Sequence, residues 1–212
     1  MSFTKQFLQK SAEVIERFDV SQIESIVDVL ASVRAKGGRL FLLGSGGGAG
    51  HASHAACDFR KLCNIETYAP YDNVSELTAR VNDEGWDTTL SNWLRVSRLR
   101  ADDCVFIFSV GGGSAEAKIS MNLVNAVRLA KTVNAQVVGI VGRDGGYTKE
   151  EGDAVVVVPV VQSDLVTPLT EGFQALIWHL IVCHPQLQVN TAKWESTEVN
   201  CAPPSATEVA CK

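Results

Sequence analysis

The feature that most constrains the fold of this chain is a regular alternation, starting at Arg39, of short apolar runs and longer segments with helical spacing. Strands that are covered on both faces read as continuous apolar runs, and they belong to parallel sheets flanked by helices. The pattern predicts an α/β fold: a doubly wound five-stranded parallel sheet flanked by helices. The predicted strands are residues 40–43, 66–69 (a weaker run), 105–110, 137–141 and 154–159, and the predicted helices are residues 49–63, 86–99, 114–134 and 170–182.

Two further helices are expected before this alternation begins. Residues 2–35 carry apolar side chains at helical spacing, with a break at residues 19–21, and Gly37 and Gly38 end the second helix. We expect the first of these N-terminal helices to pack on a partner subunit, because it lies outside the repeating pattern. The domain prediction is an N-terminal helical segment (1–36), an α/β domain (37–185) and a loosely ordered C-terminal tail (186–212) that is rich in Pro, Ser and Thr.

Length and composition indicate an ordinary soluble globular protein. The chain has 212 residues, enough for one domain, and 46% of them are hydrophobic. The formal charge of -5 has the wrong sign for a protein that coats nucleic acid. The N-terminus lacks the apolar core of a signal peptide, and no run approaches the roughly 18 apolar residues of a membrane span. We therefore expect a cytoplasmic protein without nucleic-acid or membrane partners.

The six cysteines are dispersed along the chain and form no CxxC pair. This spacing is not that of a zinc ribbon. Buried small side chains or free thiols are the expected state.

A glycine-rich loop follows the first predicted strand, reading Gly44-Ser45-Gly46-Gly47-Gly48-Ala49-Gly50. Glycines permit positive φ and let backbone N–H groups turn inward, while the start of the next helix attracts anions. The loop lacks the Lys-Ser/Thr pair of a P-loop and departs from the dinucleotide-binding pattern. On its own, a tight turn without a ligand explains it equally well.

A second loop of the same kind follows the central predicted strand, reading Ser109-Val110-Gly111-Gly112-Gly113-Ser114. Ligands of open parallel sheets bind outside the carboxyl ends of the strands, where the strand order reverses. Two such loops can converge on one phosphate and bind it with amides and hydroxyls. A third turn, residues 142–146, is either a simple turn or a further contributor to the ligand site.

Two helices carry spaced polar side chains with possible chemistry. His54 and Asp58 are four residues apart and share a helix face, as a surface pair would. Glu171 and His179 lie in an apolar helix, where a histidine is often only a core residue. Eight helical positions separate Glu171 from His179 by roughly 12 Å along the axis and ~80° around it. One metal ion reaches both only if the helix is irregular or the side chains differ in direction, which favours a site assembled near a subunit interface.

The order of these motifs resembles the phosphoheptose isomerases of the SIS (sugar isomerase) family over residues 38–184. The matching segments are GSGGGAGHASHAACDF, YDNVSELTARVNDEGWD, FSVGGGSAEAK, GIVGRDGG and TEGFQALIWHLI. The chain departs from the family pattern in the first loop, where Ser45 replaces Asn and Gly48 replaces Ser. It also has Asp58 for the family's Glu and Glu171 for its Gln.

The resemblance implies a zinc site and an acid–base pair in one place. By position, the implied metal ligands are His54, Asp58, Glu171 and His179, and the implied catalytic residues are Asp58, His179 and Glu171. Asn82 and Asp83 are expected to meet the sugar hydroxyl groups. The full set of implied substrate-binding residues is Ser45, Gly46, Gly47, Gly48, Asn82, Asp83, Ser109, Val110, Gly111 and Ser114.

The function implied by the resemblance is interconversion of a ketose phosphate and an aldose phosphate. The expected substrate is sedoheptulose 7-phosphate, converted through an enediol to D-glycero-D-manno-heptose 7-phosphate, by a homotetramer with active sites near the subunit interfaces. Two alternatives remain: an isomerase of a different phosphosugar, or a non-catalytic module that senses a phosphosugar or docks a protein.

Overall fold

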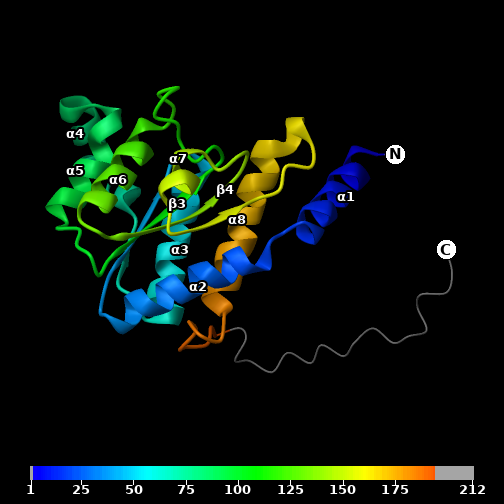
Figure 1. The fold of residues 1–212 in the computed structure, drawn as a ribbon, viewed down its shortest axis with the longest axis horizontal. Coiled ribbons are helices and arrows are strands. Elements are labelled where there is room, and N and C mark those ends of the chain that lie inside the picture. Colours follow the sequence, from blue (N-terminus) through cyan, green and yellow to red (C-terminus); the bar gives the residue numbers. More distant parts are fainter. Residues whose placement is uncertain (1, 194–212) are drawn as a thin grey trace.

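The computed structural model describes residues 2–193 and contains one five-stranded parallel sheet of order β2-β1-β3-β4-β5 (Figure 1). Every neighbouring pair in it is parallel. The strand order reverses between β1 and β3, as in a doubly wound fold. This confirms the predicted fold class. The strands are β1 (Leu40–Gly44), β2 (Thr67–Tyr68), β3 (Cys104–Ser109), β4 (Gln136–Val141) and β5 (Ala154–Val157).

Helices cover both faces of the sheet. One apolar layer lies between the sheet and α2, α3 and α8, and the other lies between the sheet and α5 and α6. The strands divide their side chains between these layers by alternation: Phe106 and Phe108 face the first layer, and Val105 and Ile107 face the second. The helices are α1 (Phe3–Glu16), α2 (Val20–Ala35), α3 (Gly47–Cys63), α4 (Val74–Glu84), α5 (Thr89–Val96), α6 (Met121–Thr132), α7 (Gly146–Glu151) and α8 (Val166–Cys183), with 3-10 turns at Pro70–Asp72, Trp86–Thr88 and Ser163–Leu165.

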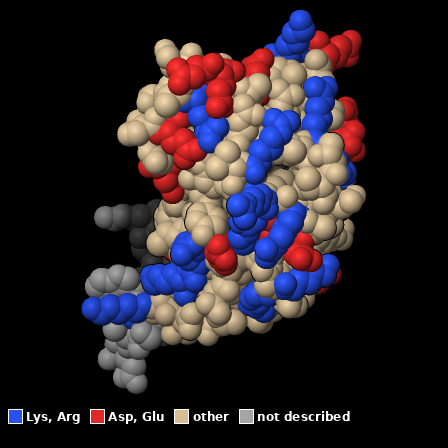
Figure 2. Space-filling view, turned by 90° about the vertical axis from the view of Figure 1, so that its left-hand side faces the viewer, with Lys and Arg blue, Asp and Glu red and all other residues tan. Residues whose placement is uncertain are grey.

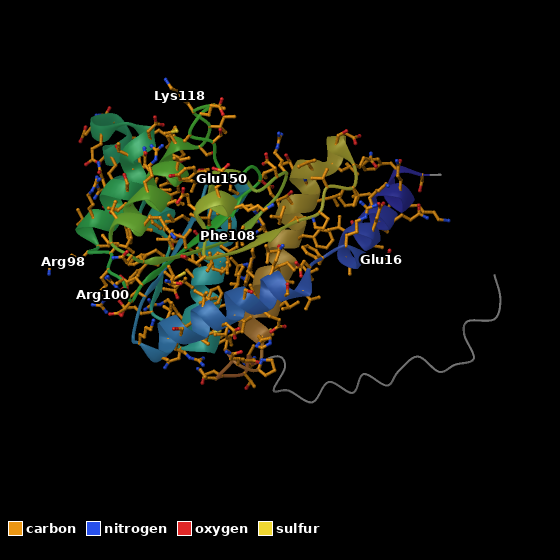
Figure 3. The ribbon with its side chains drawn as sticks, viewed as in Figure 1. Glu16, Arg98, Arg100, Phe108, Lys118 and Glu150 are labelled. Carbon is orange, nitrogen blue, oxygen red and sulfur yellow. The ribbon has the colours of Figure 1, made fainter. Side chains whose placement is uncertain are left out.

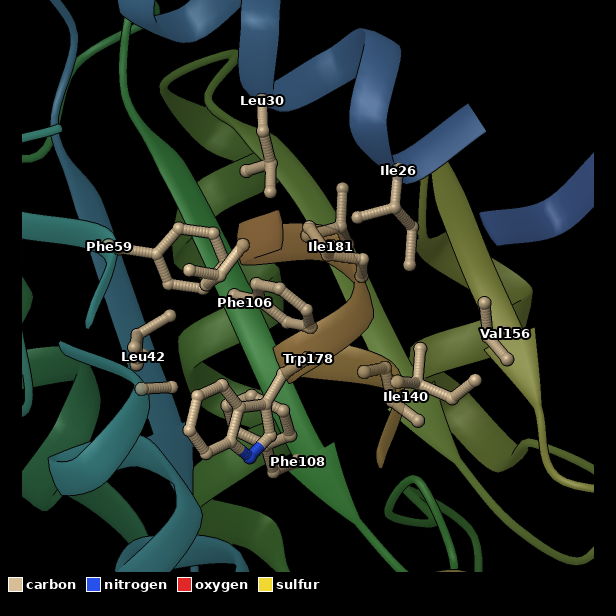
Figure 4. Close-up of a cluster of buried hydrophobic side chains, with 14 of the residues drawn as sticks. Ile26, Leu30, Leu42, Phe59, Phe106, Phe108, Ile140, Val156, Trp178 and Ile181 are labelled. Carbon is tan, nitrogen blue, oxygen red and sulfur yellow. The ribbon is translucent and has the colours of Figure 1, made fainter. Parts of the chain in front are cut away.

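Trp178 anchors α8 in the first layer. It is fully buried beside Phe108, and the rings of Phe106 and Phe108 are stacked with centroids 4.8 Å apart (Figure 4). Burying a large side chain of this kind contributes roughly 1.5–3 kcal/mol. Because the next residue is His179, the burial of Trp178 also fixes where that histidine leaves the helix.

The apolar character of α8 follows from this packing. Residues Ser163–Cys183 are long and apolar enough, by length and composition, to cross a membrane, but half of the apolar window is buried inside the protein. A core helix of a globular protein meets the same criterion.

The structure differs from the sequence-based prediction between residues 74 and 120. Helix α4 was not expected, because it buries no residue and so lacks an apolar face; the Asn73 side chain caps it by accepting from the N–H groups of Ser75 and Glu76. The helix predicted to start at residue 114 begins only at Met121. Residues 110–120 form a loop instead, closed by a bridge between Ser114 and Ile119. Helix α7 was also not expected.

The start of the predicted tail is packed against the body of the protein. Leu187 is fully buried, and Arg34 donates to the carbonyl oxygens of Leu187 and Gln186. The N–H groups of Val189 and Asn190 donate to the carbonyl of Leu62. The predicted boundary at residue 186 therefore falls inside a packed segment, whereas residues 194–212, with Cys201 and Cys211, lie outside the described residues.

Charge is spread unevenly over the surface. Figure 2 views the molecule from the left-hand side of Figure 1, the side of α4 and α5, and shows Lys and Arg as a band across the middle and lower part of this face. Asp and Glu gather at its upper left. The expectation that the protein binds no nucleic acid rests on the net charge alone and stays a prediction.

Two backbone segments cross very closely at the carboxyl end of the sheet. Gly112 has φ +68°, and a Cβ placed on it would lie 1.8 Å from the carbonyl oxygen of Gly145. The carbonyl of Gly112 accepts hydrogen bonds from the N–H and the hydroxyl of Thr148 in α7. The second loop is thus held to the third turn by main-chain contacts that no larger residue permits.

We expect Gly112→Ala to lower the free energy of unfolding far more than Gly37→Ala. Both glycines have positive φ, but nothing lies within 4 Å of a Cβ on Gly37. The control variant therefore carries only the conformational cost of about 1 kcal/mol, while Gly112→Ala adds a steric clash and exceeds about 2 kcal/mol. Urea unfolding measures the free energy of unfolding of both variants. Equal losses of stability would contradict the close backbone crossing at Gly112.

Candidate active site

The candidate site lies where the sheet order reverses, between the ends of β1 and β3. The first loop leads from β1 into α3, whose N-cap is Gly46 with φ +58°. A Cβ on Gly48 would lie 2.4 Å from the carbonyl oxygen of Phe108 at the end of β3. The absence of a side chain at Gly48 therefore lets the start of α3 touch the end of the neighbouring strand, which brings the two predicted ligand loops side by side.

Glu171 occupies the space above the first turn of α3. A Cβ on Gly47 would lie 2.6 Å from the carboxyl carbon of Glu171. A carboxylate is favoured at a helix N-terminus by the helix dipole. A phosphate at the same turn would lie beside this negative charge, which disfavours this turn as the phosphate site.

The second loop and the third turn line one cavity of about 930 Å³. Its lining includes Ser114 and Ser120, the basic Arg143, and the carboxylates of Glu116, Asp144 and Glu150. Arg143 supplies a positive charge from the third turn. In Figure 3, Lys118 projects outward from the tip of the loop, and Glu150 lies on α7.

The serines at the two ends of the second loop are already oriented by their own backbone. The Ser109 hydroxyl oxygen accepts from the Gly112 N–H at 3.0 Å, and the Ser114 hydroxyl oxygen accepts from the Ala117 N–H at 3.1 Å. Each hydroxyl accepts in these bonds and so keeps its proton to donate, as an anion requires.

Three predicted metal ligands come together between α3 and α8. The ligand atoms of His54, Asp58 and His179 all lie within 4.8 Å of one another. His54 Nε2 is 3.9 Å from Asp58 Oδ2, and the rings of His54 and His179 have centroids 5.4 Å apart. Two imidazole nitrogens and one carboxylate oxygen are a donor set that suits Zn²⁺ and leaves a fourth position open.

The tautomer of His179 follows from its contact with its own helix. His179 Nδ1 lies 2.7 Å from the carbonyl oxygen of Ala175, so this nitrogen carries the proton and donates it. Nε2 is left with its lone pair, as in metal-binding or basic histidines whose other nitrogen is held by a backbone carbonyl.

The structure does not place the other predicted residues in this group. Glu171 is not one of the three clustered ligands, and its metal role stays a prediction. Asn82 and Asp83 are exposed at the end of α4, where the Asn82 amide donates to Asp83 Oδ1 at 2.7 Å. In the described part of the chain no hydrogen bond or ion pair joins them to His54, Asp58 or His179, so their contact with substrate stays a prediction.

Two residues of the site were missed by the sequence analysis. His51 lies on α3, half-buried, with its ring centroid 6.1 Å from that of Phe108. Asn122 is fully buried near the start of α6 and donates to the Ser45 hydroxyl oxygen. His51 stands three residues before His54, a spacing that places both near one helix face. Asn122 gives no comparable signal, because its segment reads as an ordinary helix.

We expect His51 to titrate below the ordinary value of about 6.5, because burial disfavours the imidazolium and lowers the pKa. The charge of Glu171 opposes this shift, so Glu171→Gln should lower the pKa of His51 further. The unfolded chain binds this proton at higher pH, so the stability that His51 contributes is lost as the pH falls below about 6.5. NMR titration of the ring protons measures the pKa, with His184, which lies near Glu24, as the unaffected control. If the pKa of His51 were the same in Glu171→Gln as in the wild type, the Glu171 carboxylate would not act on the His51 ring, and the described arrangement of the two residues would be wrong.

Comparison with known proteins places the chain in a family. The SIS domain model matches residues 5–142. The phosphoheptose isomerase of Rhodospirillum rubrum is 30% identical over 158 residues, which cover 72% of this chain and 78% of that protein. The lincomycin biosynthesis protein LmbN of Streptomyces lincolnensis is 35% identical over 159 residues, which cover 70% of this chain but only 56% of that protein, so the chain spans little more than half of LmbN.

A solved structure shows the same fold. The phosphoheptose isomerase GmhA of Neisseria gonorrhoeae superposes with a TM-score of 0.72 at 24% identity, over 85% of this chain and 97% of that one. Together with the sequence matches, these findings show that the chain belongs to the SIS domain family, in the group that includes the phosphoheptose isomerases.

Proposed function

We propose that the protein is an aldose–ketose isomerase of a phosphosugar, with sedoheptulose 7-phosphate as substrate and D-glycero-D-manno-heptose 7-phosphate as product. The observation that carries this proposal is the convergence of His54, Asp58 and His179. The group is built on α3 and α8, and α3 begins at the first glycine loop. Relatives named phosphoheptose isomerase support the same class of reaction.

The reaction needs a base for the proton next to the carbonyl and an acid for the adjacent carbon. His179 suits the first role while its Nε2 binds no metal, because its Nδ1 proton is held by the Ala175 carbonyl and Nε2 can then accept. Asp58, whose side chain is only 17% exposed, suits the second. Glu171 stands at the start of α3, where it can meet a sugar hydroxyl. The enediol forms between the two proton transfers.

His54, Asp58 and His179 would hold a zinc ion, in accordance with the zinc cofactor that the resemblance implies. Zinc bound there would polarise the carbonyl and stabilise negative charge on its oxygen. The side chains of the protein would bind and orient the substrate and would transfer the protons.

The phosphate serves as a handle in this proposal. Ser109 and Ser114 keep hydroxyl protons to donate, and Arg143 lies beside Gly111 of the second loop. Fixing the phosphate orients the reacting carbons, an effect that supplies several kcal/mol in favourable cases. Because Glu171 covers the first turn of α3, the first loop is left for the sugar end of the substrate.

A different phosphosugar is the second candidate. LmbN is more similar to this chain in sequence than the phosphoheptose isomerases given above, and its name places it in lincomycin biosynthesis. The replacement of the family's Asn by Ser45 in the first loop also favours a different sugar. The chemistry of the reaction is the same in this candidate.

The homotetramer implied by the resemblance is also part of the proposal. Phe3, Leu8 and Ile15 on α1 are each more than half exposed, and Leu176 and Leu180 on α8 are exposed beside His179. Large apolar side chains at such positions are typical of subunit contacts. A partner chain would then approach the metal group.

The reaction is tested by incubating the protein with sedoheptulose 7-phosphate in deuterated water. We expect deuterium at C2 of the aldose product. His179→Ala should reduce its incorporation by about 10²–10⁴-fold, the usual contribution of a general base, while Cys57→Ala, an exposed neighbour of Asp58, should not. Binding without exchange, for this and other ketose phosphates, would indicate a non-catalytic phosphosugar-binding module.

The zinc site is tested by metal content and thermal stability. Dialysis against a chelator should remove the ion and lower Tm, because a ligand at 100 times its Kd stabilises by about 2.7 kcal/mol. His54→Ala should lose the ion, whereas His184→Ala, outside the group, should keep one ion per chain. Full zinc content in His54→Ala would exclude this site. Glu171→Gln should keep the ion, since Glu171 is not among the clustered ligands.

A further inference from the structure

A buried amide joins the first loop to the segment that precedes α4. Asn122 is 0% exposed, and its Nδ2 lies 3.1 Å from the Ser45 hydroxyl oxygen and 3.1 Å from the Tyr71 hydroxyl oxygen. Its Oδ1 is buried and has no hydrogen-bond partner among the described residues. A buried amide with only half of its polar atoms paired is costly, so its two bonds are expected to serve a purpose.

The direction of these hydrogen bonds follows from the protons available. The Thr89 hydroxyl donates to the carbonyl oxygen of Trp86 at 3.0 Å, which uses its one proton. Thr89 must therefore accept from Tyr71 across their 3.1 Å contact. Tyr71 has then used its own proton, so its oxygen accepts from the Asn122 amide.

If the Asn122 side-chain amide were flipped, so that Oδ1 and Nδ2 exchanged places, these hydrogen-bond directions could not be kept. Oδ1 would then accept from Tyr71, and Thr89 would need two protons to keep both of its contacts. Two buried N–H donors would also be left unpaired in place of one acceptor. The amide therefore donates, and Ser45 receives one of its two protons.

We propose that Asn122 is a positioning residue that fixes the Ser45 hydroxyl as a hydrogen-bond donor toward an acceptor oxygen of the bound sugar phosphate. Ser45 accepts from Asn122, so its own proton points elsewhere. Ser45 lies in the first loop at the end of β1, half-buried, at the edge where ligands of such sheets bind. This inference rests on the proposed function for the identity of the ligand, but not for the hydrogen-bond chain itself.

The chain also couples the first loop to the region of Asn82 and Asp83. Tyr71 stacks on Trp86 with ring centroids 5.6 Å apart, and Trp86 follows α4 after a single glycine. Asn122 is thus bonded directly to Ser45. Through Tyr71 and Thr89 it is also connected to the turn at Trp86.

The hydrogen-bond chain is tested without any substrate by titrating Tyr71. Burial raises the pKa of Tyr71, and the hydrogen bond that Asn122 donates to the Tyr71 oxygen opposes the rise. Asn122→Leu, close to Asn in shape, removes a donor to the phenolate, so the pKa of Tyr71 should rise further. A fall would mean that Asn122 accepts from Tyr71, and no change would mean that it does not bond Tyr71; either result overturns the proposal. Ultraviolet absorbance follows the phenolate, and Tyr71→Phe identifies its signal among the three tyrosines.

The role toward substrate is tested by kinetics of the intact protein. Asn122→Leu and Ser45→Ala should each raise KM for the sugar phosphate by about three- to tenfold, the usual net worth of one hydrogen bond, with little change in kcat. The double variant should be no worse than either single one, since both remove the same donor. Additive losses would mean that Asn122 acts through general structure and would overturn the proposal. Asn125→Leu, on the same helix and bonded to the Asp87 carbonyl, is the matched control.

The experiments distinguish a failure of the proposed function from a failure of the role inferred for Asn122. A wild-type protein that neither binds nor converts any sugar phosphate would refute the proposed function, and the Tyr71 titration would still report on the Asn122 chain. Normal turnover with an additive double variant would refute the positioning role of Asn122 alone.

Discussion

The site depends on one contact between main chains: the start of α3 lies directly against the end of β3. Gly48 makes this possible, since a Cβ there would lie 2.4 Å from the Phe108 carbonyl oxygen. A larger residue would push the first loop away from the second, and the two would no longer share one edge of the sheet. The same approach sets the direction of α3, and with it the positions of His54 and Asp58 opposite α8.

The packing of α8 against the sheet fixes the position of His179, the third member of the group with His54 and Asp58. Trp178 is held among Phe59, Phe106 and Phe108, so α8 cannot rotate without opening the apolar layer (Figure 4). His179 therefore leaves α8 on the side where His54 lies, and the rings of His54 and Trp178 have centroids 4.8 Å apart. The geometry of the His54, Asp58 and His179 group thus depends on the packing of the core.

The sequence predicts the central strands well because β1 and β3 are buried on both faces, and an apolar run such as that of β3 has no other simple explanation. It fails for α4, which buries nothing, and for residues 110–120, where positive φ at Gly112, Gly113 and Ser120 replaces a helical turn. His54 and Asp58 are four residues apart in one helix, so their placement on one helix face can be predicted from the sequence. The meeting of Asn122 with Ser45 joins residues 77 positions apart and depends on how α6 starts, which no local pattern encodes.

The position of Glu171 bears on where a phosphate can bind. Its carboxylate lies over Gly47, beside the loop that the sequence alone assigns to phosphate. A phosphate dianion and a carboxylate repel each other strongly in a partly buried space, so the first loop is the poorer place for the phosphate. The second loop offers serine hydroxyls that can donate, and Arg143 lies beside its Gly111, although Glu116, Asp144 and Glu150 also line this cavity. Under the proposed function, a phosphate beside Arg143 would pair opposite charges, and the carbonyl end of the substrate would lie toward α3.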